Sequence, residues 1–124
     1  MIPAEIEGLP VTIINSTSFA QHKLIKKIVI PDSVTLIGSL AFLESGLTSV
    51  KMSRSITFIA SGAFKNCTEL TDITFPDALQ KIGPEAFNGC KSLKRIVLPA
   101  SLKELVDTSI FANCTDLRNF QEWR

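Results

Sequence analysis

Apolar residues recur along this chain at fixed positions, about once every 23 residues. Four segments can be aligned, and their first residues are Ile25, Leu47, Leu70 and Leu93, with a further start at Leu117. The steps between these starts are 22, 23, 23 and 24 residues. Other positions keep the same spacing, among them the series Ile28, Val50, Ile73, Ile96, Phe120, the series Ile14, Ile37, Ile59, Ile82, Leu105, and the series Phe19, Phe42, Phe64, Phe87, Phe111. Self-similarity at a period of roughly 20–50 residues predicts a solenoid of stacked units.

Each unit opens with alternating apolar and polar residues, which is typical of a β-strand that turns one side inward. A shorter extended stretch follows, and Pro31, Pro76 and Pro99 stand at the bend between the two. Gly38 and Gly83 are expected to permit a turn after the second stretch. Residues 84–90 predict one helical turn that inserts Phe87, with a proline at its first position.

The chain therefore reads as a single solenoid of about five repeats, with parallel β-strands and short helical turns. Residues 1–24 are expected to form a degenerate N-terminal cap repeat, because Glu5 and Glu7 stand where later units are apolar. The full repeats are predicted at 25–46, 47–69, 70–92 and 93–116, with a partial repeat at 117–124.

The last segment is the opening strand of a unit without its return arc. An uncovered strand edge can template pairing with another chain. The sequence thus predicts either a fragment of a longer array or a homo-oligomer formed through the C-terminal edge at residues 114–124, unless Trp123 folds back as a plug.

Composition narrows the function less than the repeat narrows the fold. Apolar residues make up 45% and charged residues 20% of the chain, which fits an ordered domain. The net charge of +1 predicts no nucleic-acid partner. We expect no membrane span, since no apolar run is long enough, and the start of this chain does not resemble a signal peptide.

The repeat pattern L-x-x-I-x-I-P-x-x-[VIL]-x-x-I-G-x-x-A-F-x-x-C, over about residues 11–121, resembles the BspA-like, or Treponema-type, leucine-rich repeats. The resemblance implies a right-handed solenoid, a bacterial surface or secreted protein, and an adhesin or interaction module, often for host extracellular matrix. It therefore suggests an extracellular or cell-surface location, while the missing signal peptide leaves a cytoplasmic one open. The chain departs from the pattern at Ser53 in the proline position, at His22 and Ser45 in the cysteine position, and at Val106 in the glycine position.

The residues that could carry chemistry have simpler structural interpretations. Cys67, Cys90 and Cys114 fall in one repeat position, where we expect buried thiols rather than a disulfide or a zinc site, because stacked side chains point in parallel. His22 is the only histidine, and no nucleophile is placed beside it by the repeat. The sequence therefore predicts no enzyme, no metal and no cofactor.

Candidate binding residues lie where the strands should turn outward. In the second stretch, Ile13, Leu36 and Phe58 would stack as an exposed apolar strip, which favours a partner unless another segment covers it. In the first strand, the outward residues include Lys27, Lys51, Asp72 and Arg95, a mixed polar surface. We expect a protein or glycan ligand; the alternative is a structural spacer that binds nothing.

Overall fold

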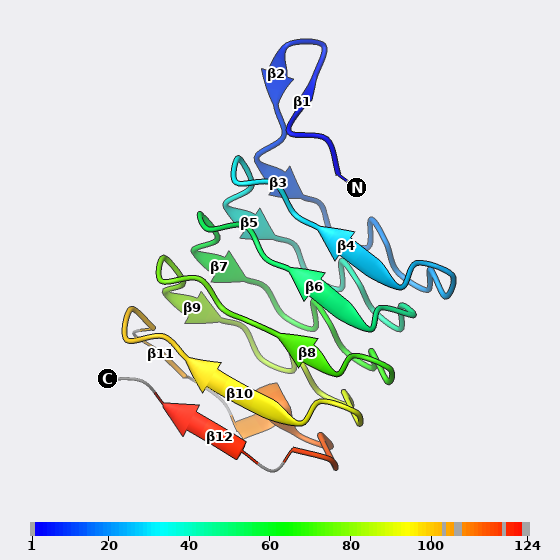
Figure 1. The fold of residues 1–124 in the computed structure, drawn as a ribbon, viewed down its shortest axis with the longest axis vertical. Coiled ribbons are helices and arrows are strands. Elements are labelled where there is room, and N and C mark those ends of the chain that lie inside the picture. Colours follow the sequence, from blue (N-terminus) through cyan, green and yellow to red (C-terminus); the bar gives the residue numbers. More distant parts are fainter. Residues whose placement is uncertain (1, 103, 106–107, 118, 123–124) are drawn as a thin grey trace.

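The computed structural model describes residues 2–102, 104–105, 108–117 and 119–122, which wind into a stack of similar turns (Figure 1). Each turn contributes a strand at two positions, which we call the first-strand and second-strand positions. The first-strand position holds β4 (Lys27–Val29), β6 (Ser49–Lys51), β8 (Asp72–Ile73), β10 (Arg95–Leu98) and β12 (Asn119–Glu122). The second-strand position holds β3 (Ile13–Ile14), β5 (Leu36–Ile37), β7 (Phe58–Ile59), β9 (Lys81–Ile82) and β11 (Glu104–Leu105).

The register of the second-strand sheet confirms the predicted direction of the side chains. Its five strands pair in parallel in the order β11-β9-β7-β5-β3. Ile14, Ile37 and Ile59 are register partners and are buried. The residues before them belong to the opposite face, because successive side chains of a strand alternate.

A column of phenylalanine rings fills the interior between the strands and the return arc. The return arc is the segment that leads from the second strand of one turn to the first strand of the next. The rings of Phe42, Phe64 and Phe87 stack with centroid separations of 5.0 and 5.1 Å and interplanar angles of 8° and 6°. Phe19 and Phe111 extend the column at its two ends. Phe64 and Phe87 are fully buried, as the repeat predicts, so this column is the centre of the core.

The return arc is built from reverse turns instead of the predicted helical turn. In residues 83–90, Ala86 N–H donates to the Gly83 carbonyl at 3.3 Å and Cys90 N–H donates to the Phe87 carbonyl at 3.2 Å. The third residue of each turn is left-handed, with φ of 60° at Glu85 and 82° at Gly89, which is typical of type II turns and interrupts a helix. Among the described residues, the single helix is the 3₁₀ segment η1 (Thr108–Phe111).

The prediction that Gly38 and Gly83 permit a turn was wrong in its reason. Neither residue has a positive φ. Instead, a Cβ at Gly38 would lie 2.7 Å from the Ser16 nitrogen, and a Cβ at Gly83 would lie 2.7 Å from the Ser61 nitrogen. These two glycines therefore let their own turns closely approach the backbone of the turn before.

Ser53 replaces proline without loss of local structure. Its side chain is buried, and its hydroxyl donates to the Val34 carbonyl at 2.7 Å while accepting from Ser55 N–H at 3.0 Å. The hydroxyl thus satisfies the backbone at the bend that a proline ring closes in other turns.

The N-terminal segment contains a hairpin that projects from the end of the stack (Figure 1). Strands β1 (Glu5–Ile6) and β2 (Leu9–Pro10) are antiparallel. Glu7 and Gly8 join them with φ of 53° and 80°, the two positive values that a type I′ turn requires. Glu7 therefore serves this turn, and the boundaries of a cap repeat at 1–24 stay a prediction.

At the other end, β12 pairs in parallel with β10, with Phe120 opposite Ile96 as the repeat predicts. Trp123 and Val106 lie outside the described residues.

Candidate functional site

The structure brings Ile13, Leu36 and Phe58 together on the outer face of the second-strand sheet, and we call these three residues the apolar strip. They are successive register partners on β3, β5 and β7. Ile13 is 47% exposed, and Leu36 and Phe58 are half-buried. The N-terminal hairpin projects from the end of the stack, away from β5 and β7 (Figure 1).

A row of threonines runs beside the apolar strip. The Thr35 hydroxyl donates to the Thr12 carbonyl at 3.4 Å, and the Thr57 hydroxyl donates to the Thr35 carbonyl at 3.3 Å. At the end of the strip, Lys81 Nζ lies 5.7 Å from the centroid of the Phe58 ring, in cation–π contact. The strip is thus bordered by polar groups that are already engaged with the sheet.

The four charged candidates of the first strand do not form one row. Lys27 and Asp72 share a row with Ser49 between them, whereas Lys51 lies opposite Val29 in the next row. Arg95 belongs to β10, which pairs with β12 and not with β8. The mixed polar surface predicted from the sequence is therefore divided.

The division coincides with an interruption of the first-strand sheet. Strands β4, β6 and β8 form one sheet, and β10 and β12 form another. Residues 71–77 and 94–98, all of which the structure describes, share no backbone hydrogen bond. In the previous turn, by contrast, Thr71 N–H donates to the Thr48 carbonyl at 3.0 Å.

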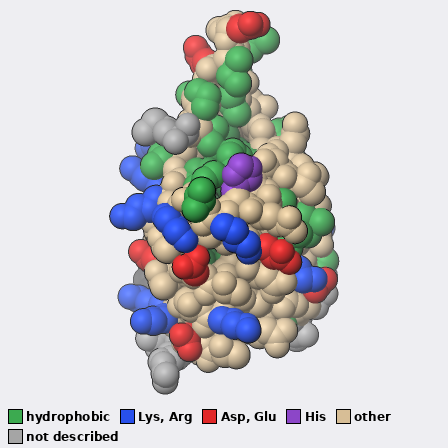
Figure 2. Space-filling view, turned by 90° about the vertical axis from the view of Figure 1, so that its right-hand side faces the viewer, with side chains coloured by type: hydrophobic (Ala, Val, Ile, Leu, Met, Phe, Trp, Pro, Cys, Tyr) green, Lys and Arg blue, Asp and Glu red, His purple; other side chains and the backbone are tan. Residues whose placement is uncertain are grey.

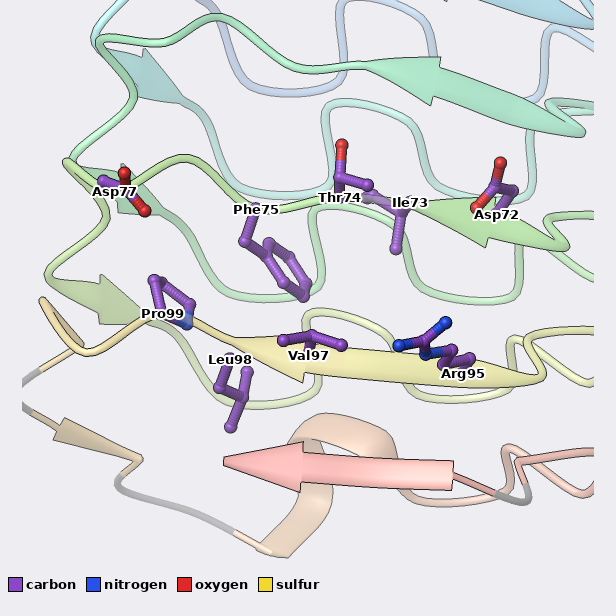
Figure 3. A pocket seen from close by; sticks show the side chains of 9 residues that line it. All are labelled: Asp72, Ile73, Thr74, Phe75, Asp77, Arg95, Val97, Leu98 and Pro99. Carbon is purple, nitrogen blue, oxygen red and sulfur yellow. The ribbon is translucent and has the colours of Figure 1, made fainter. Parts of the chain in front are cut away.

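A cavity of about 520 Å³ occupies this interruption (Figure 3). Asp72 and Arg95 lie at one end and Asp77 at the other, so two of the predicted site residues meet here. Between the ends, apolar side chains from both strands line the cavity: Ile73, Phe75, Val97, Leu98 and Pro99. Thr74 completes the lining. The volume of the cavity is within the range of roughly 300–1,000 Å³ that small-ligand sites have.

Phe75 is the residue that sequence analysis missed here. Its repeat position holds Ile30, Met52 and Leu98 in other turns, which are all buried, whereas Phe75 is half-buried. Its ring packs edge-on against Phe87, with centroids 5.6 Å apart and an interplanar angle of 81°. This larger ring lines the cavity between β8 and β10, which makes it the candidate for the side chain that separates the two strands. An aromatic residue in an otherwise aliphatic position was the available signal.

The three thiols are free, as expected. Cys67 and Cys90 are buried, but Cys114 is only half-buried. Each Sγ donates to a phenylalanine carbonyl of the preceding turn, at 3.1 to 3.2 Å. A hydrogen bond with Cys67 and burial raise the pKa of the Cys90 thiol far above its usual range, and burial raises the pKa of Cys114. These groups act as structural thiols that close the return arc.

The remaining candidates show no assembled chemistry. His22 is exposed, and its ring lies edge-on to the Phe19 ring, with the ring centroids 6.1 Å apart. Within the described part of the chain, no three His, Cys, Asp or Glu side chains form a group that could hold a metal ion. None of its helices is long and apolar enough to cross a membrane.

Exposed large apolar residues concentrate at the N-terminal end of the stack. In the described residues they are Ile6, Leu9, Ile13, Leu24 and Val29. Figure 2 shows hydrophobic side chains gathered toward the hairpin, with acidic and basic side chains interspersed over the rest of that face. No single charge dominates the face, so the apolar end is its distinctive feature.

Parallel strands, a buried leucine position and a turn of about 23 residues define a leucine-rich-repeat fold. The family described as BspA type Leucine rich repeat region matches residues 8–121 in six copies, one more than the sequence predicts. The chain belongs to this family. No curated protein matches it.

Solved bacterial structures share the fold. A leucine rich cell surface protein from Faecalibacterium prausnitzii is 32% identical, with a TM-score of 0.86 over 91% of this chain and 30% of its own. A Bacteroides ovatus leucine-rich repeat protein is 30% identical, with a TM-score of 0.88 over 97% and 32%. The Treponema pallidum leucine rich repeat protein is 26% identical, with a TM-score of 0.88 over 98% and 71%. The chain therefore spans about a third of the length of two of these proteins, and none of the matches indicates a catalytic family.

Proposed function

We propose that this chain is a non-enzymatic protein-interaction module of a bacterial surface or secreted protein, and that it binds its ligand through the apolar strip. The observation that carries the proposal is the strip itself: three large apolar side chains lie in register on the outer face of a sheet whose neighbouring row is polar. A contiguous exposed apolar surface is uncommon without a partner.

The similarity to a cell surface protein supports the proposed location. The family supports an adhesin-type role, in which the repeats present a rigid surface to a host matrix protein or glycan. Right-handed winding and association through residues 114–124 stay predictions, and light scattering at several concentrations tests the second.

The test measures binding of the purified chain to immobilised fibronectin, laminin, fibrinogen and collagen by surface plasmon resonance. We expect saturable binding to at least one of them, and we expect Phe58→Ser to weaken it about tenfold or more, because aromatic anchors dominate such interfaces. Gln80→Ser is the matched control, since Gln80 is exposed and immediately precedes β9, beyond the strip.

Two results would contradict the proposal. Binding that Phe58→Ser and Leu36→Ser leave unchanged would place the ligand elsewhere. No binding to any of the four proteins would favour the structural spacer.

A further inference from the structure

We propose that the opening between β8 and β10 is a second binding site, which takes an extended peptide segment with an apolar side chain and a basic residue. This inference rests on the proposed interaction function and names a partner class for a different surface of the chain. The carrying observation is that one cavity combines unpaired strand edges, an apolar floor and charged ends.

The strand edges favour a peptide over other ligands. Main-chain N–H and C=O groups require hydrogen-bond partners, and those that face the opening find none between residues 71–77 and 94–98. An extended peptide supplies complementary main-chain groups along its whole length, which is the basis of recognition by β-strand addition. The neighbouring strands are parallel, so a peptide that runs with them continues the geometry of the sheet.

The floor of the cavity selects an apolar side chain. Phe75, Val97 and Leu98 line the opening between its two ends (Figure 3). Val97 and Phe75 are half-buried, so an aliphatic side chain placed over them would exclude water from surface that is now exposed.

The charged ends select a basic residue. Asp72 and Arg95 carry opposite charges at one end, whereas Asp77 stands alone at the other. Asp77 makes no ion pair with another described residue, in contrast to Asp32 at the same repeat position two turns earlier, which binds Arg54 at 2.9 Å. A lysine of the peptide would complement Asp77, and the two carboxylates disfavour polyanions such as nucleic acids.

The probe is the peptide Ser-Val-Leu-Val-Lys-amide with fluorescein on its N-terminal amine and its lysine free, added to the full chain in a fluorescence anisotropy titration. We expect saturable binding that Val97→Trp weakens about tenfold or more, because the indole would cover the apolar lining of the opening. Gln80→Trp is the control for an added surface tryptophan, since Gln80 is exposed and immediately precedes β9 of the other sheet. Amide shifts of Ile73 and Val97 in an NMR titration should locate the peptide.

Charge reversal gives a second, independent test that does not disturb the core. The wild-type chain should prefer the lysine peptide over its glutamate counterpart by a few-fold, and Asp77→Lys should reverse that preference, because an exposed ion pair contributes only modestly. Asp77 is exposed, so this variant should fold.

The outcomes separate the two proposals. If the peptide does not bind but matrix-protein binding still depends on Phe58, this inference is wrong and the proposed function stands. If neither the peptide nor any matrix protein binds, this inference and the proposed function are both rejected. Binding of maltohexaose in place of the peptide, with shifts at Ile73 and Val97, would overturn the peptide assignment in favour of a glycan.

Discussion

The two sheets of the solenoid come from the same repeats, yet one is continuous and the other is interrupted. The second-strand sheet pairs without a break from β3 to β11. The first-strand sheet stops pairing between β8 and β10, and the cavity lies there. Both belong to the same turns, so the cause must lie in side chains that differ between the two positions.

The inward side chains supply that difference. The second-strand position repeats isoleucine at Ile14, Ile37, Ile59 and Ile82, so each turn adds the same volume. At the end of the first strand, two residues beyond Ile28 and its register partners, the inward position holds Ile30, Met52, Phe75 and Leu98, whose sizes vary. A stack holds the spacing of about 4.8 Å between strands only when each turn fills its layer alike.

The largest expected effect comes from removing a ring on which both sheets rest. Phe87 is fully buried and contacts Phe64, Phe75 and Phe111. Phe87→Ala should lower the free energy of unfolding by about 3–5 kcal/mol, measured by chemical denaturation. Phe75→Ala is the matched comparison and should cost less, because Phe75 is half-buried. A loss below about 1 kcal/mol for Phe87→Ala would show that the ring column is not the core.

A methyl group at Gly83 should break the continuity of the second-strand sheet. Its Cβ would lie 2.7 Å from the Ser61 nitrogen and 3.0 Å from the Ala60 carbonyl carbon. Both are backbone atoms, so a change of side-chain rotamer cannot relieve the clash. We expect Gly83→Ala to cost about 1–3 kcal/mol and to speed amide exchange in β9.

The control for this prediction occupies the same repeat position one turn earlier. Ala60 already carries a methyl group there, so Ala60→Gly should change stability by about 1 kcal/mol or less. Unchanged exchange in β9 of Gly83→Ala would mean that the turns have room to spare.

Much of this comparison could be predicted from the sequence. The spacing of Ile14, Ile37 and Ile59 gives both the strand direction and the buried side, because a period of two assigns every residue to a face. It also places Ile13, Leu36 and Phe58 together outside. These features depend on local alternation and on the repeat alone.

The remainder depends on how turns fit against each other. The type II turns follow from φ values at Glu85 and Gly89 that no apolar pattern encodes. The cavity is lined by Phe75, whose edge-on contact with Phe87 depends on how the two turns fit together in three dimensions. The ligand stays a prediction, because a repeat surface of this kind suits many partners.

A smaller side chain at position 75 should close the interruption between β8 and β10. Phe75→Leu restores an aliphatic residue to its position, so we expect β8 and β10 to approach and pair, with stability within about 1.5 kcal/mol of the wild type. Amide exchange at Arg95 and Val97 should slow, measured by NMR. Met52→Leu changes the same position in the paired part of the sheet and should leave exchange unaltered. Equal exchange rates in Phe75→Leu and the wild type would mean that another residue separates the strands.

The smallest expected effect concerns the pH dependence of stability at two aspartates in the same repeat position. Asp32 lies in the paired part of the first-strand sheet, and Asp77 lies beside the cavity. Hydrogen bonds from the Arg54 backbone and side chain, both 2.9 Å long, lower the pKa of Asp32 below its ordinary value of 3.8. A carboxylate whose folded pKa is lowered contributes stability above its unfolded pKa and loses it as the pH falls. Thermal unfolding should therefore show a slightly smaller loss of Tm for Asp32→Asn than for the wild type between about pH 5 and pH 2. Asp77→Asn, which removes the carboxylate at the same repeat position beside the cavity, is the matched comparison. An equal reduction of the Tm loss in both variants would show that the contact with Arg54 does not distinguish Asp32 from Asp77.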